Sequence, residues 1–237
     1  MPLRKFSLPE YAPAYKLTAM QAAAVFFTGV LFVLAPVPQL LVQKSSTLAL
    51  LTSSLLSPAA GILIMSMMLI HFGGFPALQI RKLTLHDITD CIRGTLLIVL
   101  CYMSVNALWK LLLQFLDIPF AENQQLMAIA ENCTPLEFFF FTLLVTVPVP
   151  IAEELLFRRI LFDGLQPLGT YTALLITSAV FAAVHLFPAG LPGLFIIGAG
   201  FQWIYLRQKN LLSAVFCHAM LNGISVIAVL FTTLTGH

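Results

Sequence analysis

Long apolar stretches constrain this chain more than any other feature of its sequence. Hydrophobic residues make up 59% of the 237 positions and charged residues only 9%, whereas a soluble globular domain has about 25% charged residues. A membrane-spanning helix needs roughly 20 mostly apolar residues, and we place about seven such stretches along the chain. The sequence therefore predicts an all-α fold, a polytopic transmembrane helical bundle in a lipid bilayer. The stretches are Leu17–Leu34, Leu48–Phe72, Ile92–Leu116, Leu136–Leu165, Thr170–Phe187, Leu191–Leu206 and Leu211–Phe231.

The fourth stretch is too long for one straight span. Pro148 and Pro150 lie inside it, and a proline within a helix removes a hydrogen bond and kinks or breaks the helix. Broken backbone at membrane depth is tolerated where it lines a cavity enclosed by protein. We therefore expect a kink or break at these prolines.

The basic residues of the loops indicate how the chain is oriented. Arg4, Lys5 and Lys16 precede the first stretch, while the loop 117–135 contains no Lys or Arg. Because cytoplasmic loops carry the excess of Lys and Arg, this distribution predicts a cytoplasmic N-terminus and, with seven spans, a C-terminus outside. The first stretch is expected to be retained, because Ala35 at its end is followed by proline and no A-x-A cleavage pattern is present.

Charge and cysteine content exclude several classes of partner. The net charge is +2 and its Lys and Arg are spread among the loops, so the basic patch typical of a nucleic-acid-binding protein is missing. The four cysteines form no C-x-x-C pair, and we expect neither a zinc site nor a disulfide framework. We expect all four to be apolar packing residues: Cys91, Cys101, Cys133 and Cys217.

Two adjacent acids and two adjacent bases lie in the interior of the fourth stretch: Glu153, Glu154, Arg158 and Arg159. Each such residue at the centre of a membrane helix costs about 2.5 to 3.5 kcal/mol on insertion scales, which implies pairing or function. Glu154 and Arg158 are four positions apart with the acid first, the favourable arrangement for a helical ion pair. Glu153 points about 100° away and is expected to face a cavity. The alternative is that both glutamates only form buried salt bridges.

Two later stretches contribute polar groups at matching depth. His185 follows Phe181 by one helical turn in the fifth stretch. At 1.5 Å per residue, Glu153 lies roughly 20 Å before the turn at 166–169 and His185 roughly 24 Å after it. A helical hairpin would therefore bring the two side chains to one level, although a lone histidine on an apolar helix is more often a packing residue.

His218 and Asn222 are four positions apart in the last stretch. Residues at this spacing share one helix face and can converge on one ligand atom. By the same rise per residue they lie roughly 12 and 18 Å from the turn near Asn210. Either side chain alone could instead form an ordinary interhelical hydrogen bond.

Taken together, these residues resemble the three motifs of a known family. Glu153 to Arg158 resembles E-E-x-x-x-R, Phe181 to His185 resembles F-x-x-x-H, and His218 to Asn222 resembles H-x-x-x-N. In this order they are similar to the type II CAAX prenyl endopeptidase and bacteriocin-processing (CPBP, Abi) family of intramembrane proteases. The resemblance covers 136–227 and divides the chain into N-terminal transmembrane helices at 1–135 and a peptidase core at 136–232. Arg159 departs from the small residue that many relatives have there.

The resemblance implies a glutamate-dependent endopeptidase with a catalytic cavity inside the membrane and without a metal or other cofactor. In such an enzyme Glu153, helped by His185, would activate a water for attack on a peptide carbonyl, and burial opposed by a nearby cation could poise this carboxylate as a general base. His218 and Asn222 would donate hydrogen bonds to the oxyanion. Glu154, Arg158 and Phe181 would support the site. The expected partner is a peptide or protein substrate, and the expected location is a bacterial inner membrane.

Other functions remain open on the residues alone. Two histidines and a glutamate can bind zinc with an open position for water, although H-E-x-x-H is absent. A serine mechanism is disfavoured because no G-x-S-x-G elbow occurs, and paired membrane aspartates are missing. Outside enzymes, the polar groups could serve a proton relay in a transporter, or only the structure of an immunity or scaffold protein.

Overall fold

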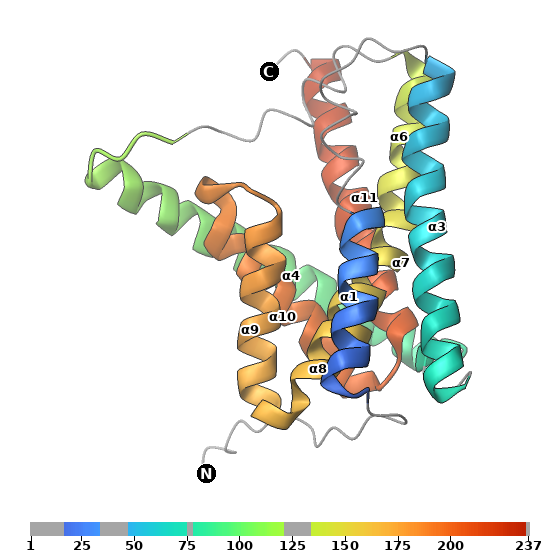
Figure 1. Ribbon diagram of the computed structural model, residues 1–237. Coiled ribbons are helices and arrows are strands. Elements are labelled where there is room, and N and C mark those ends of the chain that lie inside the picture. Colours follow the sequence, from blue (N-terminus) through green and yellow to red (C-terminus); the bar gives the residue numbers. More distant parts are fainter. Residues whose placement is uncertain (1–16, 34–46, 75–77, 121–133, 236–237) are drawn as a thin grey trace.

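The computed structural model describes residues 17–33, 47–74, 78–120 and 134–235, and these parts of the chain are helical, without a strand (Figure 1). In chain order the elements are α1 (Ala19–Val33), α3 (Thr47–Gly73), α4 (Leu85–Phe115), α6 (Pro135–Thr146), α7 (Pro148–Glu154), the π-helix η2 (Leu155–Phe162), α8 (Asp163–Leu165), the 3-10 helix η3 (Gln166–Leu168), α9 (Thr170–Val184), the 3-10 helix η4 (Pro188–Gly190), α10 (Leu191–Gln208) and α11 (Leu211–Thr235).

Four helical segments within the described residues are long and apolar enough to cross a membrane. They are Leu85–Phe115, Pro135–Leu168, Pro188–Gln208 and Leu211–Thr233, and each coincides with one of the predicted stretches. The other three predicted stretches correspond to shorter apolar helices. The prediction of an all-α membrane bundle is confirmed.

The bundle has two sides joined by a tilted helix. α3, α6 and α11 pack together on one side, while α9 and α10 form a hairpin on the other (Figure 1). α4 crosses behind them and packs against both α10 and α11, and η2 contacts α1, α9 and α11. The segment α7–η2 therefore lies inside the bundle, with helices from both sides around it.

The fourth predicted stretch is broken where its prolines indicated. α6 ends at Thr146, Val147 has φ −121° and ψ −77°, and Pro148 begins α7. Proline is tolerated at this first helical position because its missing N–H would have no helical acceptor. The predicted break is thus confirmed. After Glu154 the helix widens into the π-helix η2, a form that is rare and frequent at functional sites.

Side-chain caps fix the starts of two membrane helices. Thr84 accepts from the backbone N–H of Asp87, and the Asp87 side chain accepts from the backbone of Thr84. Thr134 and Glu137 form the same reciprocal pair at the start of α6. Each box satisfies two N–H groups that the helix itself leaves without a partner. The starts of α4 and α6 are therefore set by local sequence.

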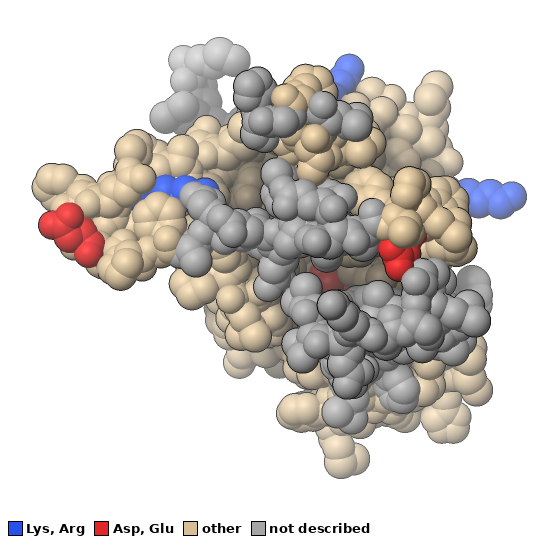
Figure 2. All heavy atoms as spheres, turned by 90° about the horizontal axis from the view of Figure 1, so that it is seen from above, with Lys and Arg blue, Asp and Glu red and all other residues tan. Residues whose placement is uncertain are grey.

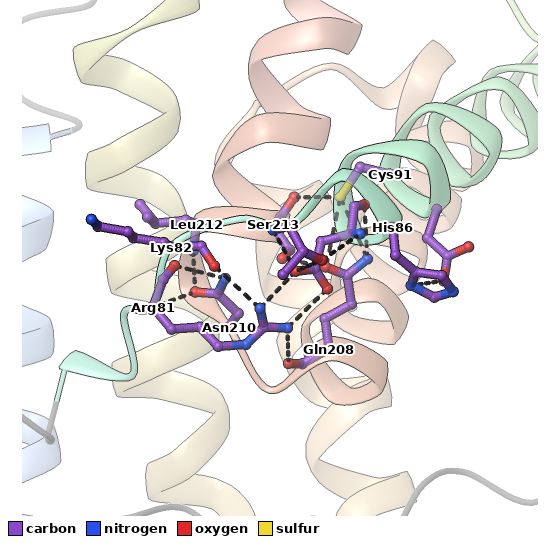
Figure 3. A network of polar contacts seen from close by, with 11 residues as sticks. Arg81, Lys82, His86, Cys91, Gln208, Asn210, Leu212 and Ser213 are labelled. Atoms are coloured by element: carbon purple, nitrogen blue, oxygen red, sulfur yellow. Dashed lines mark hydrogen bonds and ion pairs between the residues drawn. The ribbon is translucent and has the colours of Figure 1, made fainter.

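A polar network anchors α11 to the start of α4 (Figure 3). The Asn210 side chain donates to the Arg81 carbonyl and accepts from the Arg81 and Leu212 N–H groups. Arg81 binds both carboxylate oxygens of Asp87, at 2.6 and 2.9 Å, and this hydrogen bonding raises the pKa of the guanidinium above its usual value. The network holds the N-terminal end of α11 and thereby sets the register of the residues farther along this helix.

Two predicted packing cysteines meet between α4 and α11, next to this network. Cys91 on α4 and Cys217 on α11 are fully buried, and the Cys217 thiol lies 3.6 Å from the Cys91 carbonyl oxygen. Both are free thiols, as is the exposed Cys101. Their role as packing residues between α4 and α11 agrees with the prediction, whereas Cys133 lies outside the described residues.

Candidate active site

Glu154 occupies the centre of the polar cluster in the bundle. It lies at the end of α7 and its side chain is completely buried. One carboxylate oxygen, Oε1, is 2.8 Å from Nδ1 of His218 on α11. The other, Oε2, is 2.9 Å from Nε of Arg158. Both oxygens of this acid therefore have a cationic or donor group beside them, which a buried charge requires.

Arg158 is held on several sides within η2. Arg158 forms the predicted ion pair with Glu154, four positions before it in the sequence. Nε and Oε2 are close enough for an ionic contact but are not aligned for a hydrogen bond. Its Nη2 donates to the Gly198 carbonyl at 3.2 Å. Its guanidinium carbon lies 4.9 Å from the ring centroid of Phe181 and 5.5 Å from that of Phe201. Aromatic faces attract a desolvated cation, so these contacts favour a single position of Arg158.

Glu153 has a different environment from its neighbour. Its side chain is 13% exposed, and its Oε2 is 3.8 Å from Nε2 of His218. That separation exceeds a direct hydrogen bond, and Oε2 accepts none from the described residues. The two adjacent acids are therefore distinguished by their partners: Glu154 is engaged at both oxygens, while Glu153 offers a buried acceptor beside an imidazole.

His218 bridges the two acids. Nδ1 faces Glu154 and Nε2 faces Glu153. Because a carboxylate only accepts hydrogen bonds, the proton between His218 and Glu154 belongs to Nδ1. Glu154 has His218 at one oxygen and Arg158 at the other. The cluster thus matches the pairing rule for charges inside a membrane.

His185 stands at the end of α9 and is exposed. Its Nδ1 lies 2.7 Å from the Phe181 carbonyl, and since a carbonyl only accepts, Nδ1 carries the proton and Nε2 is free to accept. The Phe181 ring contacts both His185 and His218, with centroids 4.8 and 6.1 Å away. Within the described residues His185 joins the cluster through Phe181, and no direct contact to Glu153 is among its interactions.

His185 is exposed although the helices around it are apolar, because α9 is short. α9 has 15 residues, which corresponds to roughly 22 Å at 1.5 Å per residue. The hydrocarbon core of a bilayer is about 30 Å thick. The α9–α10 turn consequently ends well below the far ends of α3 and α11 (Figure 1).

Asn222 lies one turn after His218 on α11, as its spacing predicted, but its amide is turned to the backbone. Nδ2 donates to the Val145 carbonyl at 2.8 Å. Val145 is two residues before the break at Val147, where carbonyls lose their helical donors. Asn222 therefore stabilises the break between α6 and α7 and keeps one further N–H for another acceptor.

The structure also shows contacts that the motifs did not reveal. Phe201 on α10 is completely buried and stacks on His218. Arg159, the departure from the expected motif, is buried and pairs with Asp163. The Arg159 pair could have been expected from its i, i+4 spacing, but Phe201 carried no sequence signal because it is one of 20 phenylalanines.

Figure 2 looks onto the end of the bundle where α6 begins. Most described side chains on this face are uncharged, and acidic atoms are recessed in a hollow near its centre. Among the described residues, no three His, Cys, Asp or Glu side chains gather as metal ligands would.

Two comparisons with known proteins found similar sequences. Residues 135–224 match the family model described as "Type II CAAX prenyl endopeptidase Rce1-like". The chain is also 32% identical over 111 residues to a Bacillus subtilis (strain 168) protein with the printed name "Putative membrane peptidase YdiL". That match spans 45% of this chain and 43% of the length of the relative. No solved structure matches. The matched region, which contains Glu153, His185, His218 and Asn222, is thus similar to the Rce1-like family.

Proposed function

We propose that this chain is an intramembrane endopeptidase in which Glu153 activates a water for attack on a peptide bond. The observation that carries the proposal is the difference between the two adjacent acids. Oε1 of Glu154 is 2.8 Å from His218, and its Oε2, which accepts no hydrogen bond from the described residues, is in ionic contact with Arg158. Oε2 of Glu153 is also buried without a hydrogen bond from the described residues, but its charged or polar neighbour, Nε2 of His218, is 3.8 Å away. A general base needs a free acceptor oxygen within reach of the proton it abstracts.

The proposed reaction moves one proton through Glu153. The carboxylate removes a proton from water while the water oxygen bonds to the carbonyl carbon of the scissile peptide. His185 helps hold this water through Nε2, the acceptor left by its Nδ1 contact. As the tetrahedral intermediate collapses, the C–N bond breaks and Glu153 returns the proton to the leaving amine.

Negative charge that develops on the carbonyl oxygen needs donors. His218 supplies Nε2–H in its protonated form, which Glu154 stabilises through Nδ1. Asn222 supplies the N–H that is not bound to Val145. Removal of one such donor costs about 3 to 4 kcal/mol in other hydrolases. Arg158 holds Glu154 in place through their ionic contact.

The substrate and location proposed here follow the family. The B. subtilis relative is named as a membrane peptidase, and we propose a peptide or protein substrate cleaved at the membrane by the core at 136–232. We further propose a bacterial inner membrane with the N-terminus in the cytoplasm, because α1 begins at the end of the bundle where α10 ends (Figure 1). Arg207 and Lys209 are at that end of α10, and Arg81 lies beside them because it binds the Gln208 carbonyl, so basic residues gather on the side that the positive-inside rule makes cytoplasmic.

The test is cleavage of a peptide library by the purified full chain in liposomes. Glu153→Gln is expected to reduce kcat by about 10² to 10⁴-fold, the usual contribution of a general base, with normal membrane insertion. Glu137→Gln is the matched control, because Glu137 lies in the same predicted span but caps the start of α6. Cleavage by Glu153→Gln at the rate of the control would refute this role, and loss of activity with a chelator followed by recovery with zinc would favour a metalloprotease.

A further inference from the structure

Helix α10 contributes a side chain to the core of the site although none of the three motifs lies on it. Phe201 is completely buried and touches two members of the cluster. Resting on the function proposed above, we propose that Phe201 is a positioning residue that sets the plane of the His218 imidazole between Glu153 and Glu154.

The geometry of His218 shows why such a residue is needed. The ring turns about its Cβ–Cγ bond, and the 2.8 Å contact from Nδ1 to Glu154 restrains that rotation at one edge of the ring only. The Phe201 and His218 rings are stacked, with centroids 4.9 Å apart and planes 27° apart. Stacking restrains this remaining rotation, and rotation would carry Nε2 away from Glu153.

Phe181 cannot replace Phe201 in this role. Its ring meets His218 edge to face, with centroids 6.1 Å apart and planes 73° apart. The same ring also contacts His185 and Arg158. Phe181 therefore closes the second side of His218, while Phe201 supplies the parallel face.

Phe201 is itself held in place by the neighbouring turn of α10. Gly198, three residues earlier, accepts the hydrogen bond from Arg158. A Cβ at Gly198 would lie 3.2 Å from the Ser178 Cα and 3.2 Å from Cδ1 of Phe181, so α10 approaches α9 closely here. The guanidinium of Arg158 lies 5.5 Å from the Phe201 ring. One helix thus contacts both partners of Glu154, Arg158 and His218.

The experiment compares Phe201→Leu, Phe201→Tyr and Phe162→Leu in the reconstituted full chain. Phe162 is a matched control, because it is also completely buried and its ring packs against Tyr205. Phe201→Leu is expected to lower kcat about 100-fold, the effect of a displacement near 1 Å, with KM changed less than threefold. Phe201→Tyr keeps the aromatic face and should recover kcat to within about fivefold of wild type by the same argument.

The ¹⁵N spectrum of the histidine rings gives a second readout that needs no substrate. Phe201→Leu should shift or broaden the His218 ring resonances, and Phe162→Leu should leave them unchanged. Equal loss of kcat in both leucine variants, or an unchanged His218 spectrum in Phe201→Leu, would overturn the positioning role. If the wild type cleaves no peptide, the proposed function fails, and the spectrum alone then decides the role of Phe201.

Discussion

Replacing Arg158 by methionine tests whether the buried ion pair holds the bundle together. Arg158 and Glu154 have no exposed side-chain surface, and their charged atoms are 2.9 Å apart. Removal of one partner leaves Glu154 charged inside the protein with only His218 beside it. Breaking a buried pair in this way costs about 3 to 5 kcal/mol. We expect Arg158→Met to lower the free energy of unfolding by this amount.

The double variant Glu154→Met, Arg158→Met separates the pair from simple packing. It removes both charges of the pair, although His218 loses its acceptor at Nδ1, and replacement of a buried pair by apolar residues is often neutral or stabilising. Unfolding in mixed micelles, followed by the fluorescence of the two tryptophans, measures each variant. Arg207→Met is the control, because Arg207 is half exposed and 3.3 Å from Asp90, and an exposed pair contributes about 0 to 1 kcal/mol. A double variant whose loss equals the sum of both single losses would refute the reasoning.

Three further changes have expected outcomes. Gly198→Ala places a Cβ 3.2 Å from the Ser178 Cα, and we expect a loss of about 1 to 3 kcal/mol in the same unfolding assay, as for other overpacked cores; no loss would show that α9 and α10 can separate freely. Asn222→Ala removes the hydrogen bond to Val145 and should lower the free energy of unfolding by about 0.6 kcal/mol, the average for interhelical bonds in a membrane protein. It should also lower kcat, which a purely structural amide would not do. Thr84→Ala removes the cap of α4 and should cost about 1 kcal/mol while kcat stays at the wild-type value, and a lower kcat would link the start of α4 to the site.

Local rules account for much of the fold and for one ion pair of the site. Hydropathy located the membrane helices, because lipid exposure demands apolar residues over a fixed length. Pro148 marked the break before α7, because a proline restricts its own φ and lacks a donor. The Glu154–Arg158 pair followed from spacing alone, because residues four apart on a helix are neighbours. These features depend on residues close in sequence.

Some residues of the candidate site have surroundings that spacing could not predict. His218 and Asn222 lie one turn apart on α11 as expected, yet His218 binds Glu154 and Asn222 binds Val145. The direction of each side chain depends on which helix packs beside it. The π-helix after Glu154 also changes which residues share a face, and the sequence analysis assumed a regular α-helix there.

The sequence by itself determined that this chain is a bundle of apolar helices, with a set of polar residues inside the predicted spans of its C-terminal half: Glu153, Glu154, Arg158, Arg159, His185, His218 and Asn222. Only the tertiary structure decided that Glu154 is engaged at both oxygens, that Glu153 retains a free one, and that Phe201 stacks on His218. The physical reason is range: hydropathy and helical spacing act within one helix, whereas these contacts join α7, α10 and α11 and exist only where those helices cross.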